Sequence, residues 1–118
     1  MKPSKDAHLL EYIIQYCDEV SMTLEACEGN RERFEKSLVL RNACAMAIGQ
    51  VGELAKHLSD DALTGMPEIP WRNVKGLRDC FDHGTHHLNV QIMWETALED
   101  IPMFRRICCE YIKKVQNQ

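Results

Sequence analysis

The spacing of apolar residues is the feature that most constrains the fold of this chain. Along four stretches, apolar side chains recur at steps of three and four residues, which places them on one face of an α-helix. These stretches predict helices over about 6–28, 31–58, 70–83 and 90–115. No stretch of useful length alternates between apolar and polar residues as a half-buried strand does. The sequence therefore predicts an all-α fold.

Helix-breaking residues separate the four predicted helices. Gly29 suits the end of the first, and Pro70 suits the first turn of the third, where a backbone N–H is not needed. The longest connection runs from about Ser59 to Ile69. Pro102 falls inside the fourth helix and is expected to kink or split it. Mostly short connections favour antiparallel neighbours, so we expect an antiparallel four-helix bundle with the last helix kinked or split near Pro102.

The second predicted helix is long and has small residues in its middle. Its apolar pattern continues from Phe34 through Leu38 and Ile48 to Leu58. The small residues are Ala43, Ala45, Ala47, Gly49 and Gly52. Because small side chains let backbones approach one another, we expect another helix to pack closely here.

The composition is that of a globular protein. The 118 residues suit one domain, 1–118, and 45% hydrophobic with 27% charged residues lies outside the range of disordered chains. No apolar run is long enough to span a bilayer and the first residues do not resemble a secretory signal, so we expect a cytoplasmic protein with no membrane partner. The six cysteines form no C-x-x-C pair and mostly have helical core spacing, which favours reduced thiols.

The charge of the chain is acidic, but one helix carries a local basic stripe. A net charge of −4 argues against broad, non-specific nucleic-acid binding. Arg72 and Lys75 lie three residues apart on the third predicted helix, and Arg78 continues the row. Such a stripe can follow a phosphate backbone. The alternative is that Arg72 and Lys75 are ordinary solvated charges.

A polar segment, LRDCFDHGTHHLN at 77–89, follows in the sequence. Arg78 is suited to bidentate phosphate binding, and His83 can transfer a proton near neutral pH. A turn beginning at Gly84 can bring the imidazole back toward the guanidinium, and the two groups together meet the minimum for cleaving RNA without a metal. The alternative is an i, i+4 salt bridge between Arg78 and Asp82.

The same segment raises the alternative of a metal site. Its candidate ligands are Asp79, Asp82, His83, His86 and His87. His83 and His87 have the i, i+4 spacing of helical zinc ligands, but Gly84 lies between them and no second ligand cluster exists elsewhere in the sequence. We therefore predict no metal and no cofactor, and interpret His86 and His87 as loop residues.

Several motifs in order along the chain resemble one family. They are IGQVGELAKHLS at 48–59, IPWR at 69–72, GLRD at 76–79, His83-Gly84, WET at 94–96 and DIP at 100–102. This pattern is similar to the HepT-like ribonucleases of the HEPN superfamily, the toxins of HepT/MNT toxin–antitoxin pairs. The resemblance implies a helical bundle that forms a homodimer and acts as a metal-independent endoribonuclease on RNA, with tRNA among the family's substrates.

The resemblance also implies roles for individual residues. Arg78 would hold the scissile phosphate, His83 would act as acid or base, and Asp79 would occupy the polar position after the arginine. Two such Arg/His pairs would meet in a composite cleft at the dimer interface. Glu53 would orient Arg78, unless it is simply a half-exposed helix carboxylate.

One departure from the family pattern bears on regulation. Relatives carry His-Gly-Tyr, and a partner minimal nucleotidyltransferase, the antitoxin, adenylylates that tyrosine; here Thr85 stands in its place. A threonine hydroxyl can still accept a nucleotidyl group but differs in reach and chemistry. Two further hypotheses therefore stay open: a non-catalytic helical module that binds a nucleotidyltransferase, and a structural or metal-binding protein unrelated to RNA.

Overall fold

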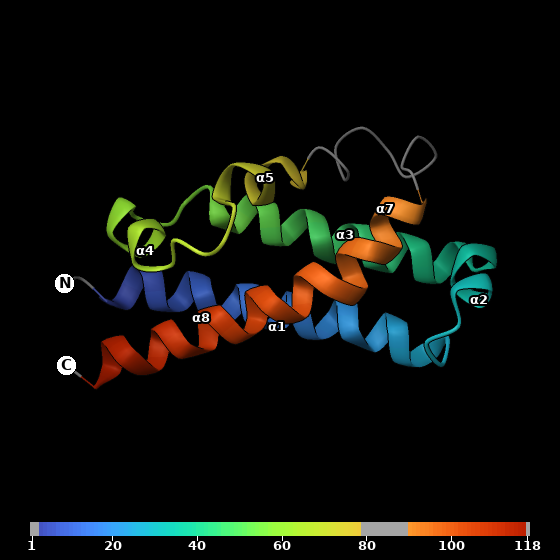
Figure 1. Ribbon diagram of the computed structural model, residues 1–118, viewed down its shortest axis with the longest axis horizontal. Helices are drawn as coiled ribbons and strands as arrows, with labels where there is room; N and C mark the ends of the chain where they lie inside the picture. Colours follow the sequence, from blue (N-terminus) through green and yellow to red (C-terminus); the bar gives the residue numbers. More distant parts are fainter. Residues whose placement is uncertain (1–2, 79–89, 118) are drawn as a thin grey trace.

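The computed structural model describes residues 3–78 and 90–117, and every regular element in these ranges is helical. The all-α prediction is confirmed (Figure 1). The elements are α1 (Pro3–Ala26), α2 (Arg31–Lys36), α3 (Leu38–Ala55), α4 (Asp60–Gly65), α5 (Trp71–Gly76), α7 (Val90–Glu95), the π-helical turn η2 (Thr96–Asp100) and α8 (Ile101–Gln116).

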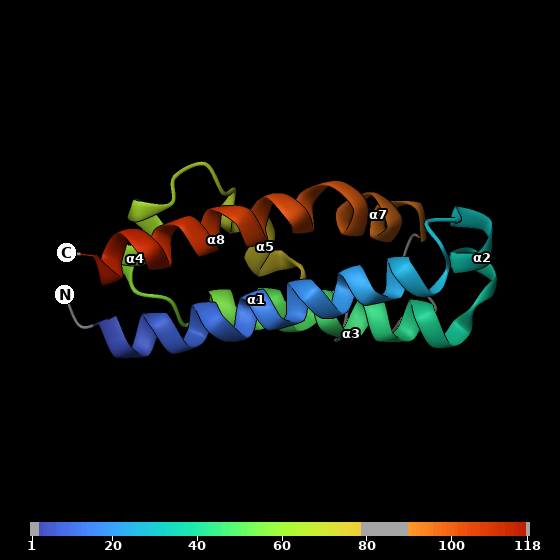
Figure 2. The same ribbon diagram turned by 90° about the horizontal axis from the view of Figure 1, so that it is seen from below.

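Three long helices form the body of the molecule. α1 and α3 lie side by side and antiparallel, and α8 packs along α1, as both views show (Figures 1 and 2). The two termini therefore lie at the same end. α5 lies on α3, away from the contact between α1 and α8. None of the described helices combines the length and apolar character that crossing a bilayer needs.

The core is built from one apolar face of each long helix. Its fully buried side chains include Leu10, Ile13, Cys17, Val20, Phe34, Val51, Ile101 and Cys108. Burial raises the pKa of the Cys17 and Cys108 thiols to about 12 in each case. The five cysteines in the described part of the chain are free, and four of them, Cys17, Cys27, Cys44 and Cys108, are buried and pack as small hydrophobic residues.

The second predicted helix is divided, and the prediction of one helix over 31–58 was wrong at Ser37. This residue has an extended backbone (φ −98°, ψ 104°), and its side chain accepts a hydrogen bond from the Leu40 N–H at 3.1 Å. A serine hydroxyl that caps a new helix competes with helix continuation. Leu38, expected in the core, lies in the first turn of α3 and is 59% exposed.

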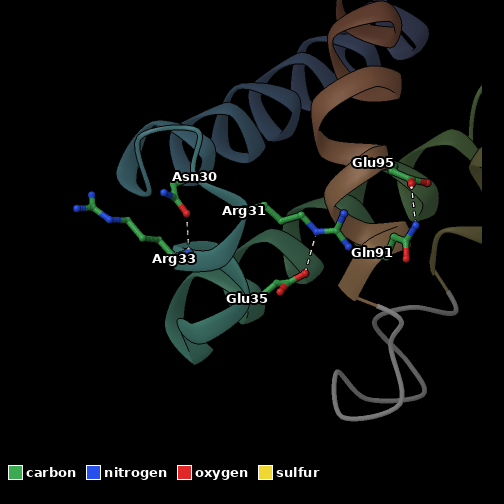
Figure 3. A network of polar contacts seen from close by, with 6 residues as sticks. All are labelled: Asn30, Arg31, Arg33, Glu35, Gln91 and Glu95. Carbon is green, nitrogen blue, oxygen red and sulfur yellow. Dashed lines mark hydrogen bonds and ion pairs between the residues drawn. The ribbon is translucent and has the colours of Figure 1, made fainter.

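α2 is short and is held by polar contacts at its own residues. Asn30 caps it by accepting a hydrogen bond from the Arg33 N–H at 3.1 Å (Figure 3). One turn apart on its surface, Arg31 Nε donates to Oε1 of Glu35 at 2.8 Å (Figure 3). Both contacts are local; the packing of the buried Phe34 side chain in the core holds this six-residue helix on the rest of the fold.

The connection at 59–69 contains a helix that the sequence did not predict, α4. Ser59 caps it by accepting from the Ala62 N–H at 3.1 Å, and Asp60 and Asp61 place negative charge at its N-terminus. The buried carboxylate of Asp6 fixes the cap: Oδ1 accepts from the Ser59 N–H at 3.0 Å and Oδ2 from its hydroxyl at 2.5 Å. This contact ties α4 to the start of α1.

Just before Pro102, the last helical stretch contains a π-helical turn between two α-helices. In the π-helical turn η2, the Ile101 N–H bonds to the carbonyl of Thr96, five residues earlier. Pro102 follows in the first turn of α8, where it has no N–H to donate. The irregularity expected at Pro102 thus falls in the turn just before it, and the chain is helical on both sides.

Candidate functional site

α5 places the start of the polar segment against the C-terminal part of α3, at Gly52 and Glu53. At its first residue, Trp71, the indole Nε1 donates to the Met66 carbonyl at 3.0 Å. At its middle, Val74 is buried. α5 ends at Gly76, with Leu77 as its C-cap, and Arg78 follows. The third helix was expected to run to His83; its residues from Asp79 onward lie outside the described part of the chain.

Arg78 and Glu53 form an ion pair between two elements. The Nε of Arg78 lies 2.9 Å from Oε2 of Glu53, with side chains 43% and 36% exposed. The two atoms are at ion-pair distance without the alignment of a hydrogen bond. Glu53 comes from α3, so the folding of α5 onto α3 creates the contact. A half-exposed guanidinium next to a fixed carboxylate can bind a phosphate while its orientation is constrained.

His57, which the sequence analysis did not single out, is a neighbour of this pair. Its Nε2 lies 3.7 Å from Oε1 of Glu53, and the imidazole is 58% exposed. The i, i+4 spacing of Glu53 and His57 on a helix was the signal that could have found it. Glu53 therefore faces a permanent cation through one oxygen and a titratable group through the other.

The remaining predicted site residues are not among those that the structure describes. Asp79, His83 and Thr85 lie in 79–89, as do His86 and His87. Their roles stay predictions. Two of the predicted site residues, Glu53 and Arg78, lie in the described part of the chain and contact each other.

The two other members of the predicted basic stripe lie on α5. Arg72 is exposed and Lys75 is half-buried. Arg78 follows the C-cap Leu77, so three cationic residues lie at steps of three along 72–78. A single-stranded phosphate backbone is the kind of ligand that such an arrangement attracts.

Within 3–78 and 90–117, no three His, Cys, Asp or Glu side chains group as a metal site. The histidines at 83, 86 and 87 lie outside these ranges.

Comparison with known proteins adds to this geometry. Residues 9–111 match the family described as "Ribonuclease HepT-like". The chain is 31% identical over 106 residues, 89% of this chain and 92% of the relative, to the protein named "Putative RNase TTE0752" from Caldanaerobacter subterraneus subsp. tengcongensis.

Two archaeal proteins named as ribonucleases are also similar to this chain. One is named "Probable ribonuclease HepT", from Thermococcus cleftensis, with 35% identity over 63 residues, 53% of this chain and 57% of the relative. The other is named "Putative RNase MJ1216", from Methanocaldococcus jannaschii, with 25% identity over 117 residues, 98% of this chain and 95% of the relative. No solved structure matches the chain. The family match spans most of the sequence and includes both Glu53 and Arg78, and the chain therefore belongs to the HepT-like ribonuclease family.

Proposed function

We propose that this protein is a metal-independent endoribonuclease and the toxin of a HepT/MNT-type toxin–antitoxin pair. The observation that carries the proposal is the Arg78–Glu53 pair, in which a cation from the predicted Arg-x4-His motif is held by a carboxylate of another helix and keeps 43% of its surface open. Family membership supplies the reaction class, because the matching relatives are named as RNases.

In this proposal each residue has a distinct task in the transesterification of RNA. The 2′-oxygen attacks phosphorus, the bond to the 5′-oxygen breaks, and a proton moves from the attacking to the leaving oxygen by way of acid/base groups. Arg78 stabilises the negative charge that develops on the phosphoryl oxygens. His83 donates or accepts the proton. Glu53 orients Arg78, Asp79 supports the phosphate-binding end of the motif, and Arg72 and Lys75 bind flanking phosphates.

The proposal includes a homodimer in which two Arg78/His83 sites share one cleft. An exposed stripe along α3 supports this part. Val39 and Met46, two turns apart, are 76% and 50% exposed, and Glu53 lies two turns further on the same stripe. An apolar stripe that leads to the ion pair suits an interface between two copies, because the buried strip and the site would be continuous.

Sedimentation tests the dimer. Val39→Glu should convert the dimer to a monomer, because an unpaired charge would be buried at the interface. Met22→Glu is the control, since Met22 is also exposed, at 63%, but lies on α1. A wild-type monomer at the concentrations used for cleavage would exclude the composite cleft.

The alternative is a non-catalytic helical module that binds the nucleotidyltransferase antitoxin. Thr85 in place of the family tyrosine favours it, since both adenylylation and any RNA contact made by the phenol would be altered. In either case we propose a minimal nucleotidyltransferase as partner. Mass spectrometry of the protein treated with that enzyme and ATP would show whether Thr85 gains a nucleotide.

RNA cleavage in excess chelator tests the proposed activity. Wild-type protein should cleave tRNA or generic RNA, and Arg78→Ala and His83→Ala should cleave it far more slowly. Arg31→Ala is the matched control, because Arg31 also pairs with a glutamate at a similar distance and exposure. Equal inertness of all four proteins would contradict the ribonuclease proposal. Activity that disappears with chelator would revive the metal alternative.

A further inference from the structure

α3 and the end of α5 come closest at Gly52. A Cβ atom added at this residue would lie 2.7 Å from the Arg78 nitrogen, 2.8 Å from the Val74 carbonyl oxygen and 3.2 Å from the Leu77 carbonyl carbon. All three neighbours are backbone atoms, which cannot rotate away as the end of a side chain can. Any larger residue at position 52 therefore has to separate the two elements.

Backbone conformation does not explain a glycine here. Gly52 lies inside α3, and the positive-φ glycine of the described chain is Gly29. A glycine in a helix interior is less favourable than alanine. Its presence is accounted for by the space that the backbone of 74–78 occupies.

We propose that Gly52 is a positioning residue for Arg78. Its bare backbone lets the Arg78 main chain settle against α3, and the next residue, Glu53, pairs with the Arg78 side chain. The glycine at position 52 thus lets the arginine backbone pack closely, and the carboxylate at position 53 pairs with the arginine side chain. This inference rests on the proposed function for its catalytic consequence, but the packing it describes can be tested without activity.

Displacement of Arg78 should lower the rate of the reaction more than it weakens RNA binding. In Gly52→Ala, the new methyl group pushes against the segment that carries the arginine. A misplacement of about 1 Å at a catalytic group can cost about 100-fold in rate. We expect kcat to fall about 10- to 100-fold, with KM changing less, because the charge that attracts RNA is retained.

Two glycine-to-alanine variants serve as matched controls. Gly76 lies two residues before Arg78 and has nothing within 4 Å of an added Cβ, so Gly76→Ala should keep kcat and the melting temperature of the wild type. Gly65 is also closely packed, but against the ring of Tyr111. Gly65→Ala should lower the melting temperature without changing kcat, which separates a packing defect from a positioning defect.

Nuclear magnetic resonance supplies a readout that is independent of catalysis. The Arg78 Nε–H signal should move in Gly52→Ala toward its position in Glu53→Gln, and should stay in place in Gly76→Ala. If wild-type protein cleaves no RNA but this signal moves, the proposed function fails and the positioning of Arg78 by Gly52 stands. An unmoved signal, or a wild-type kcat in a folded Gly52→Ala protein, overturns the inference.

A measurement on wild-type protein covers the case in which Gly52→Ala does not fold. A nuclear Overhauser effect between the Gly52 Hα protons and the Arg78 amide proton is expected from the close approach of the two backbones. Its presence supports the packing on which the inference depends. Its absence overturns the inference.

Discussion

Two arginine–glutamate pairs in this molecule are nearly alike in distance and exposure and differ in what they connect. Arg31 and Glu35 on α2 are 2.8 Å apart with side chains 44% and 41% exposed, and Arg78 and Glu53 are 2.9 Å apart with side chains 43% and 36% exposed. The first pair spans one turn of one helix (Figure 3). The second joins α3 to Arg78, which follows the C-cap of α5.

The difference teaches that distance and exposure do not distinguish a structural pair from a functional one. Exposed pairs of either kind contribute about 0–1 kcal/mol to stability. What sets Arg78 apart is its surroundings: the basic residues of α5, the imidazole near the other oxygen of Glu53, and a backbone packed against Gly52. If these surroundings mean function, the two pairs should differ in RNA cleavage while resembling each other in stability.

The largest difference is expected when the arginines are removed. Arg78→Ala should lower kcat about 100- to 1,000-fold, as loss of one group that stabilises developing charge does. Its free energy of unfolding should change by less than about 1 kcal/mol. Arg31→Ala should match that small change in stability and keep wild-type cleavage. Single-turnover cleavage and denaturant unfolding measure the two quantities; similar rates for both variants would remove the distinction between the pairs.

A third carboxylate, Asp6, is an example of a purely structural contact with which the two pairs can be compared. It is 6% exposed, and both oxygens accept hydrogen bonds from Ser59. Asp6→Ala leaves these buried donors unpaired, so unfolding should become easier by about 1–3 kcal/mol. Cleavage per folded molecule should not change. A rate loss that exceeds the loss of folded protein would show that this end of the molecule also serves the reaction.

Replacing the two glutamates should produce a smaller difference in kcat than replacing the two arginines. Glu53→Gln keeps the size of the side chain and removes the charge that orients Arg78, and we expect kcat to fall about 10-fold, equivalent to about 1.4 kcal/mol. Glu35→Gln is the matched control and should not alter kcat. An unchanged rate in Glu53→Gln would indicate that the guanidinium is positioned by other contacts.

The smallest effect is expected in the stability of α2. Breaking the Arg31–Glu35 pair by Glu35→Gln should reduce the free energy of unfolding by about 0.2–0.5 kcal/mol, the usual range for an i, i+4 pair. Chemical denaturation at low and high salt would measure it, and the loss should shrink at high salt. A loss of several kcal/mol would mean that α2 anchors more of the fold than its local contacts indicate.

The helices could be predicted because the spacing of apolar residues that forms a helix lies within the helix itself. The apolar repeat located α1 to within a few residues, and the cluster of small residues in α3 indicated a close approach by another helix. The repeat also ran unbroken through Ser37, since capping depends on one hydroxyl rather than on hydrophobicity. For the same reason the short helix α4, which depends on Ser59 and Asp6, was read as a connection.

The candidate site was less predictable because tertiary packing creates it. Neither the spacing nor the composition pairs positions 53 and 78; the family resemblance did, and the structure brings Glu53 and Arg78 together. Which element packs on Gly52 could not be predicted, since its neighbours come from α5 and the residues after it. The i, i+4 relation of Glu53 to His57 was visible in the sequence, but it has meaning only beside Arg78.

The measurement that tests the central claim most directly is a double-mutant cycle on metal-free RNA cleavage, with wild type, Arg78→Ala, Glu53→Gln and the double variant. If Glu53 acts through Arg78, Glu53→Gln lowers kcat about 10-fold in the wild type and has no further effect once Arg78 is alanine. In the same cycle on Arg31 and Glu35, kcat should stay at the wild-type value in all four proteins. Independent, additive losses at Arg78 and Glu53, or no loss at either, would contradict the account.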